Sequence, residues 1–244
     1  MPKSPTFVLI HGAWAGSWVW DSLRTLLEDQ GHAVIAPDMP GNPMHPAPAA
    51  QLTMQGCIDH LKNGCAEVSG PLLVVGHSGG GVIATQLAET LAERVVGVAY
   101  IAGMADEAQK QHPEAAGIWP HLQWSDDRQS STVPPQAVCE VFLQDLPREQ
   151  AMAAAQRFCA QPEGTRALVA EWTAERFGRL PRLYIEATQD RSVVLPVQRR
   201  MQQLVPGAAV VSLDTGHVPQ VSAIAAVADA LSNFALRQVE LRAS

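Results

Sequence analysis

The 244-residue sequence predicts an α/β fold with a mostly parallel central sheet that is flanked by helices and carries a helical cap insertion. Short apolar runs recur in both ends of the chain, and helical patterns separate the early runs. Nearly continuous apolar runs are typical of parallel strands that are buried on both faces. Their alternation with helices indicates a parallel sheet with helices on its faces.

Six short runs rich in apolar residues are expected to be strands. They are Phe7–His11, Ala33–Pro37, Leu72–Val75, Val95–Ala102, Leu183–Ala187 and Val210–Leu213. One-turn apolar spacing predicts a helix through Leu23, Leu26 and Leu27 that stops at Gly31, and another through Ile83, Leu87 and Leu91. The Pro-rich stretch 41–50 is expected to be a loop beside the sheet.

The strand and helix rhythm breaks between residues 106 and 179, where Ala, Gln, Pro and large aromatic residues accumulate. We therefore expect residues 1–105 and 180–244 to form the core, and residues 106–179 to form a helical cap over the carboxyl edge of the sheet. Its aromatic residues are candidates to line an apolar pocket, although packing of the cap explains any single one equally well. They are Trp119, Trp124, Phe142, Trp172 and Phe177.

Composition and charge exclude several classes of protein. The chain is 47% hydrophobic and 17% charged, and it has no apolar run near the roughly 18 residues that a membrane span needs. Its net charge is −7, and it has no basic stripe that would neutralise phosphates, so nucleic acid is not an expected partner. The sequence leaves the oligomeric state open, with a homodimer as one option.

The cysteines and the first residues bear on the cell compartment. Cys57, Cys65, Cys139 and Cys159 form no CxxC pair, which favours free thiols over a metal or redox site. The start of the chain, Met-Pro-Lys-Ser-Pro, lacks the long apolar region of a secretory signal. We expect a cytoplasmic protein with reduced thiols.

The strand at 72–75 leads into Gly76-His77-Ser78-Gly79-Gly80 and then into a helical pattern. This order of strand, sharp turn and helix is that of a nucleophile elbow, in which Ser78 takes a strained conformation that exposes its hydroxyl. Gly76 and Gly80 leave room for the strand and the helix to approach each other. A GxSxG pattern alone is common by chance, but this context supports Ser78 as a nucleophile.

Acyl transfer from such a serine needs two aligned N–H donors for the tetrahedral oxyanion. We expect the amide of Gly79, directly after the nucleophile, to be one donor. The other is expected in the glycine-containing turn after the first strand, at the amide of Ala13. His11 in this turn is expected to brace the loop. Trp14 is the neighbouring aromatic residue most suited to border the pocket.

A serine hydroxyl becomes a strong nucleophile when an imidazole removes its proton and a carboxylate orients that imidazole. His217, in a loop after the last strand, is the expected base. His77 adjoins the nucleophile and should point elsewhere, and His112 and His121 fall in the cap.

Asp190 follows the strand at 183–187 and precedes the expected base by one strand and helix, so it is the expected acid. Asp106, after the strand that ends at Ala102, is the alternative. Asp214 lies too close in sequence to the base, and Glu186 within its strand is expected to be a structural carboxylate.

Taken together, these motifs resemble a known family. The segments that carry the resemblance are 7–14 (FVLIHGAW), 76–80 (GHSGG), Tyr184-Ile185-Glu186 before Asp190, Gln198 to Met201, and Gly216-His217. They are similar to small α/β-hydrolases of the plant methyl esterase and hydroxynitrile lyase group and to their bacterial esterase relatives. The segment 180–234 also resembles bacterial pyrethroid-hydrolysing carboxylesterases. The resemblance covers the two ends of the chain and thins in the cap.

The resemblance implies an α/β-hydrolase fold, a Ser78, Asp190 and His217 triad, and the amides of Ala13 and Gly79 as oxyanion donors. It also marks departures from the lyases of the group, which carry Thr in place of Gly12, Glu in place of His77 and Lys in place of Val218. Without that lysine, a cyanide leaving group loses its electrostatic stabiliser. The departures therefore favour hydrolysis over C–C cleavage.

We accordingly expect a serine carboxylesterase that hydrolyses a small hydrophobic ester without a metal or an organic cofactor. Trp14, Trp119 and Trp124 are its candidate substrate contacts. Two alternatives stay open: a cofactor-independent lyase such as a hydroxynitrile lyase, and a non-catalytic protein that binds a small molecule. The sequence does not select the ester.

Overall fold

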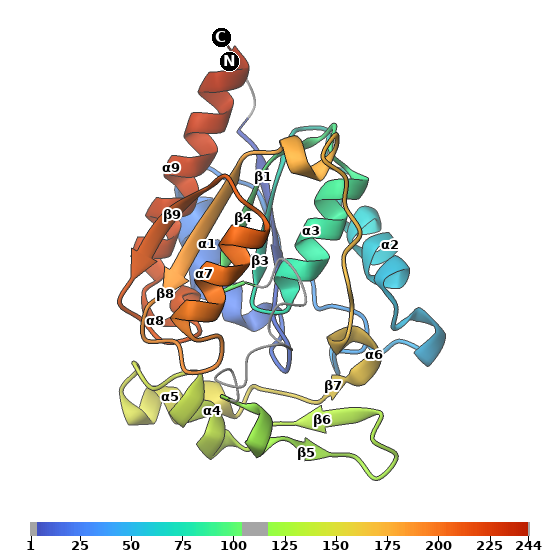
Figure 1. The fold of residues 1–244 in the computed structure, drawn as a ribbon, viewed down its shortest axis with the longest axis vertical. Coiled ribbons are helices and arrows are strands. Elements are labelled where there is room, and N and C mark those ends of the chain that lie inside the picture. Colours follow the sequence, from blue (N-terminus) through green and yellow to red (C-terminus); the bar gives the residue numbers. More distant parts are fainter. Residues whose placement is uncertain (1–3, 104–116, 244) are drawn as a thin grey trace.

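The computed structural model describes residues 4–103 and 117–243. Its main feature is a parallel six-stranded sheet with the strand order β2-β1-β3-β4-β8-β9 (Figure 1). The strands are β1 (Thr6–Ile10), β2 (Val34–Ile35), β3 (Leu72–His77), β4 (Val95–Ile101), β8 (Arg182–Ala187) and β9 (Ala208–Leu213). Each of the six expected runs overlaps one of them, so the predicted α/β fold with a parallel sheet is confirmed.

Helices cover both faces of the sheet (Figure 1). The longer ones are α1 (Asp21–Asp29), α2 (Met54–Gly64), α3 (Gly80–Thr90), α7 (Leu195–Leu204) and α9 (Ile224–Ala243). The shorter ones are η1 (Ser17–Trp20), η2 (Ala49–Gln51) and α8 (Pro219–Ser222). Because neighbouring strand residues point to opposite faces, the two sides of β1 belong to two separate cores. Phe7 and Leu9 pack with α1 and α9, whereas Val8 and Ile10 pack with α2 and α3.

The described insertion between β4 and β8 has two parts: residues 118–166 lie beyond the carboxyl edge of the sheet, at the bottom of Figure 1, whereas residues 171–179 pack beside the C-terminal end of α3. Its helices are η5 (Trp119–His121), α4 (Pro135–Val141), α5 (Arg148–Ala155), α6 (Glu163–Arg166) and η6 (Phe177–Arg179). Its strands are β5 (Gln123–Trp124), β6 (Ser130–Thr132) and β7 (Gln161–Pro162), which form a small antiparallel sheet.

The sequence predicted a helical cap, so these short strands were not expected. Strands of two or three residues are too short to show the alternation that marks a half-buried strand, and β7 ends in a proline. Val138, Phe142 and neighbouring apolar residues of the segment pack against Trp14 and Val218 from the two ends of the chain. The division of the chain at residues 106 and 180 stays a prediction.

Within the two described stretches, none of the helices is both long and apolar enough to cross a membrane.

Candidate active site

Ser78 lies at the sharp turn between β3 and α3. Its φ of 49° is in the left-handed region, which costs energy for a residue with a side chain, and its amide donates a 3.1 Å hydrogen bond to the carbonyl of Ile101. A Cβ on Gly76 would lie 2.5 Å from Cα of Gly81, and one on Gly80 would lie 2.5 Å from the backbone carbonyl of Ile10. Both positions therefore need glycine. The backbone has the geometry of the nucleophile elbow that the motif predicts.

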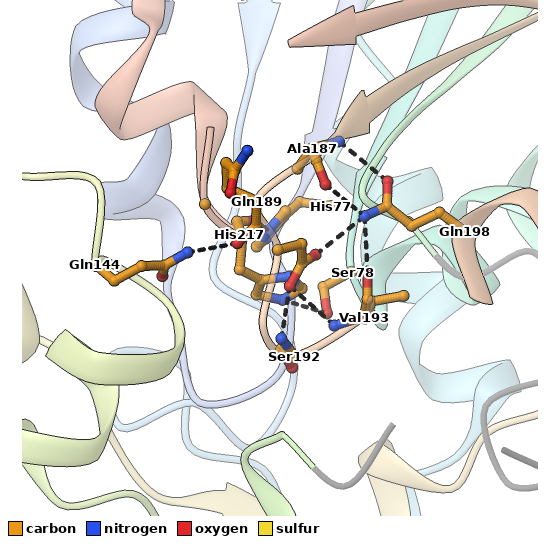
Figure 2. Close-up of polar contacts among 12 residues, drawn as sticks. His77, Ser78, Gln144, Ala187, Gln189, Ser192, Val193, Gln198 and His217 are labelled. Atoms are coloured by element: carbon orange, nitrogen blue, oxygen red, sulfur yellow. Dashed lines mark hydrogen bonds and ion pairs between the residues drawn. The ribbon is translucent and has the colours of Figure 1, made fainter. Parts of the chain in front are cut away.

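His217 connects Ser78 to Asp190. Its Nε2 lies 3.0 Å from Oγ of Ser78, and its Nδ1 lies 2.7 Å from Oδ2 of Asp190 (Figure 2). With Asp190 ionised, Nδ1–H donates to the carboxylate, and Nε2 is left to accept the serine proton. The His217 and Asp190 side chains are only 4% and 0% exposed. Asp190 follows β8 and His217 follows β9, so adjacent parallel strands bring the two side chains to one edge of the sheet.

The carboxylate of Asp190 has several donors besides the imidazole. Its Oδ1 accepts hydrogen bonds of 2.7 and 2.9 Å from the amides of Ser192 and Val193. Its Oδ2 lies 3.4 Å from Nε2 of Gln198, which is fully buried. These donors hold the carboxylate in one orientation toward His217.

Gln198 supports this loop from α7 (Figure 2). Its Nε2 donates to the carbonyls of Ala187 (2.9 Å) and Val193 (2.8 Å), and its Oε1 accepts from the amide of Ala187 (3.1 Å). No role is predicted for Gln198 from the sequence alone. Its signal was a polar residue between Val197 and Met201 on the apolar face of a helix.

The amides of Ala13 and Gly79 lie beside the serine. A Cβ on Gly79 would lie 4.0 Å from the Ala13 nitrogen, so the two backbone segments are neighbours. Among residues 4–103 and 117–243, neither amide has a protein acceptor. Two free N–H donors next to a candidate nucleophile are the arrangement that stabilises an oxyanion.

His11 braces the loop that carries Ala13. Its Nδ1 donates to the carbonyl of Gly12 (2.9 Å), and its Nε2 accepts from the amide of Met39 (3.0 Å). Burial lowers the pKa of His11, which keeps the ring neutral and suited to donate at one nitrogen and accept at the other.

Trp14 connects the same loop to the small sheet. Its backbone is also left-handed, with φ of 58°. Its amide donates to Oε1 of Gln161 in β7 (3.1 Å), and its indole donates to Oγ of Ser131 in β6 (3.0 Å). The strands that the sequence analysis missed therefore hold the candidate oxyanion loop from outside.

The other histidines considered as bases lie elsewhere. Nε2–H of His77 donates to the backbone carbonyl of His217 (2.8 Å), and the centroids of the two rings lie 4.9 Å apart, so this nitrogen is occupied by a backbone contact. Burial and the neighbouring His217 ring hold the pKa of His77 well below its ordinary value. His121 is exposed in η5, and His112 lies outside the described residues.

The alternative acids are also accounted for. Oδ1 of Asp214 accepts from the side chains of Thr188 (3.1 Å) and Gln189 (2.8 Å). Glu186 is a buried structural carboxylate that accepts from Gln202 (2.9 Å) and Ser212 (2.8 Å), among other donors. Asp106 lies outside the described residues.

A cavity opens over Ser78 and His217. Of the expected contacts it includes Trp14 and Trp119, and Phe142 and Phe158 add further aromatic surface. Phe142 packs between Trp14 and His217, with ring centroids at 6.4 and 5.0 Å. The lining combines these apolar side chains with polar ones such as Gln161 and Thr165, the mixture that a ligand with an apolar body and a polar group requires.

Trp124 does not belong to the described lining of this cavity, so its expected role as a substrate contact stays a prediction that the cavity does not support. It lies in β5, where the guanidinium of Arg128 covers its ring at 5.3 Å from the centroid. Phe177 is buried in the core beside α3, and Trp172 packs against Phe177 at 5.3 Å. These three aromatic residues pack the insertion instead.

Arg166 is a charged residue in the lining of the cavity. It forms an ion pair with Glu163 in α6, and its guanidinium lies 4.5 Å from the ring centroid of Trp119. The neighbouring carboxylate and the aromatic face both compensate the burial of its charge.

Comparison with known proteins places this geometry in a family. Residues 7–230 match the alpha/beta hydrolase family. The chain belongs to this family. Among curated relatives of this α/β hydrolase is a pyrethroid hydrolase of Sphingobium wenxiniae, which is 30% identical over 96% of this chain and 89% of the relative. Methylesterase 7 of Arabidopsis thaliana is 24% identical over 88% of this chain and 90% of the relative.

Solved structures agree with this assignment. A pyrethroid hydrolase from Sphingobium faniae superposes on the α/β hydrolase with a TM-score of 0.84 and 28% identity, over 95% of this chain and 97% of the other. Polyneuridine aldehyde esterase has a TM-score of 0.81 at 21% identity, over 95% of this chain and 99% of the other, which supports the shared fold alone.

Proposed function

We propose that this α/β hydrolase is a serine carboxylesterase that hydrolyses a small hydrophobic ester through an acyl-enzyme. The observation that carries the proposal is the position of His217, which bridges Oγ of Ser78 (3.0 Å) and the carboxylate of Asp190 (2.7 Å). The free amides of Ala13 and Gly79 beside Ser78 add the oxyanion donors that acyl transfer requires. The hydrolases and esterases among its relatives support the same reaction.

In the first half of the reaction, Oγ of Ser78 attacks the carbonyl carbon of the ester, and Nε2 of His217 takes the hydroxyl proton. Asp190 orients the imidazole and stabilises its charged form. The negative charge on the carbonyl oxygen is stabilised by the amides of Ala13 and Gly79. When the tetrahedral intermediate collapses, the bond from the carbonyl carbon to the alkoxide oxygen breaks, and His217 protonates that oxygen, so that a neutral alcohol leaves.

In the second half, His217 takes a proton from a water molecule that attacks the acyl-enzyme. A second tetrahedral intermediate forms and collapses, the acid leaves, and the proton returns to Ser78. All of these steps use side chains and amides of the chain itself.

The residue after His217 favours hydrolysis over release of cyanide from a cyanohydrin. Val218 is 1% exposed and packs with Trp14 and Val138 at the wall of the cavity. A buried valine has no charge to stabilise cyanide, whereas an alkoxide leaving group takes its proton from His217. Production of an aldehyde and cyanide without ester turnover would favour the lyase.

The cavity and the cysteines support two finer parts of the proposal. Trp14, Trp119 and Phe142 provide apolar contacts for the acyl or the alcohol group of the ester. The four cysteines are free, which suits a reducing compartment such as the cytoplasm.

The test is steady-state turnover of p-nitrophenyl esters of graded chain length, together with methyl esters, lactones and pyrethroids. Ser78→Ala should lower kcat by about 10⁴–10⁶-fold, the scale observed when a triad nucleophile is removed. Ser22→Ala, at an exposed position on α1, is the matched control and should keep full activity.

A Ser78→Ala enzyme that keeps most of its esterase activity would overturn the assignment. Labelling of Ser78 by an organophosphonate shows only that the serine is activated. Multiple turnover therefore separates an esterase from a protein that merely binds a small molecule.

A further inference from the structure

The loop between α4 and α5 contacts both loops that carry the proposed base and acid. Oδ2 of Asp145 accepts a 2.7 Å hydrogen bond from the amide of Gly216, the residue before His217. Nε2 of Gln144 donates a 2.7 Å hydrogen bond to the carbonyl of Gln189, the residue before Asp190 (Figure 2). Two neighbouring residues of the insertion thus contact the backbone directly before each proposed catalytic residue.

These contacts are close, although Asp145 is exposed and Gln144 is half-buried. A Cβ on Gly216 would lie 2.7 Å from Oδ1 of Asp145 and 2.9 Å from Nε2 of Gln144, so a side chain at position 216 would push these two side chains away. The loop is held in turn by Phe142 and Leu143, which are 2% and 0% exposed. It is therefore a firm support for the backbone that it contacts.

The acid and base loops are also connected to each other. The amide of Gln189 donates to the carbonyl of Thr215 (2.9 Å), and the side chain of Gln189 donates to Asp214 (2.8 Å). A shift of either loop would consequently change the distance between His217 and Asp190.

The backbone around His217 is held from two directions. His77 donates to its carbonyl at 2.8 Å, and Asp145 accepts from the amide of the preceding residue at 2.7 Å. The imidazole must keep contacts with Ser78 and Asp190 on opposite sides of one ring, so both its position and its rotation matter. Displacement of a catalytic group by about 1 Å can lower the rate by as much as about 10²-fold.

We propose that Asp145 is a positioning residue for the reaction, and that its carboxylate oxygen holds the Gly216 peptide so that His217 stays within reach of both Ser78 and Asp190. This role rests on the proposed function of His217 as the base. Gln144 supports the acid loop in the same way. The insertion thus contributes to the geometry of the catalytic residues as well as to the wall of the cavity.

The experiment compares Asp145→Ala with Asp145→Asn. Active sites are first titrated with an organophosphonate, so that kcat is expressed per functional site and a partly misfolded fraction does not enter. Asp145→Ala should lower this kcat about 10-fold with KM within about twofold, because it removes an acceptor that acts on the base and not on the substrate. Asp145→Asn keeps an acceptor oxygen and should restore kcat to within about threefold of the wild type.

Asp126→Ala is the matched control, because Asp126 is an exposed carboxylate in the turn between β5 and β6. Equal kcat per site for Asp145→Ala and the wild type would overturn the positioning role. Equal loss in Asp145→Ala and Asp145→Asn would also overturn it, since the charge and not the acceptor would then be what matters.

A second readout keeps this test separate from the proposed function. The proton on Nδ1 of His217, which is shared with Asp190, can be followed as a downfield signal in the proton NMR spectrum. Its exchange with water should become faster in Asp145→Ala but not in Asp145→Asn. Unchanged exchange in Asp145→Ala would count against the positioning role. If the wild type turned over no ester, or if Ser78→Ala kept its esterase activity, the proposed function would fail. The exchange measurement would still report on the position of His217.

Discussion

Replacement of Gln198 by leucine should cause a large loss in the free energy of unfolding, although only one side chain changes. The pairing of β4 with β8 ends at Ile185, so the backbone of Ala187 extends beyond its strand neighbour. Gln198 takes the place of that neighbour: it donates to the carbonyls of Ala187 and Val193 and accepts from the amide of Ala187. Leucine has a similar volume but can form none of these hydrogen bonds.

The magnitude follows from the number of backbone groups left without a partner. Gln198→Leu deprives three buried groups of a partner, and each such loss costs about 1–3 kcal/mol. The leucine side chain offsets part of this by burying more apolar surface, so we expect a net loss of about 3 kcal/mol in the free energy of unfolding. In a chain of this size that corresponds to a fall in Tm of roughly 6–12 °C.

The assay is urea and thermal unfolding followed by circular dichroism, with Gln202→Leu as the control. Gln202 lies one turn later in α7 and donates one hydrogen bond, to Glu186 at 2.9 Å, so its replacement should cost about 1 kcal/mol. Esterase activity of Gln198→Leu should fall as well, because Asp190 loses a neighbour. A Gln198→Leu protein no less stable than Gln202→Leu would refute the reasoning.

Two further predictions concern the oxyanion loop and the buried histidines. In Gly12→Ala, the new Cβ would lie 2.9 Å from Cβ of Ser78, so the loop that carries Ala13 must move. The kcat on p-nitrophenyl esters should therefore fall about 10²-fold, while Tm changes little. Full activity of Gly12→Ala would contradict the assignment of the Ala13 amide as an oxyanion donor. His77 and His11 have lowered pKa values in the folded protein because they are buried, so below about pH 6.5 the unfolded chain binds protons that the folded chain does not. Stability is therefore complete above that pH and falls by up to about 1.4 kcal/mol per pH unit for each ring as the pH drops. In His77→Gln, the free energy of unfolding, measured with urea at pH 7 and pH 5.5, should fall less with pH, by the contribution of one ring. The same fall in His77→Gln and in the wild type would show that His77 does not contribute.

Much of the site was predictable because its signals are local in sequence. A run such as Leu72–Val75 followed by Gly76 and Gly80 specifies strand, turn and helix, since each glycine meets a steric need within or next to its own segment. The order of Ser78, Asp190 and His217 became informative once the sheet was expected to be parallel, because successive strands then end at one edge. Chain order and strand direction were enough to bring these three side chains together.

The small sheet and the supports of the site were decided only by the tertiary structure. The strands β5, β6 and β7 are formed by pairing between residues 123 and 162, and segments this short carry no periodicity. Trp124 and Trp119 are both tryptophans of the insertion, yet the pairing of β5 leaves only Trp119 in the cavity.

Gln198 and Asp145 illustrate the same distinction. Each acts on a backbone group of another loop, and which backbone groups lack a partner is known only when the strands have found their neighbours. The sequence by itself determined the fold class and the elbow, and it predicted the candidate triad, because these depend on local sterics and chain order. The tertiary structure decided which polar side chains hold them in place, because hydrogen bonds between distant segments depend on how those segments pack.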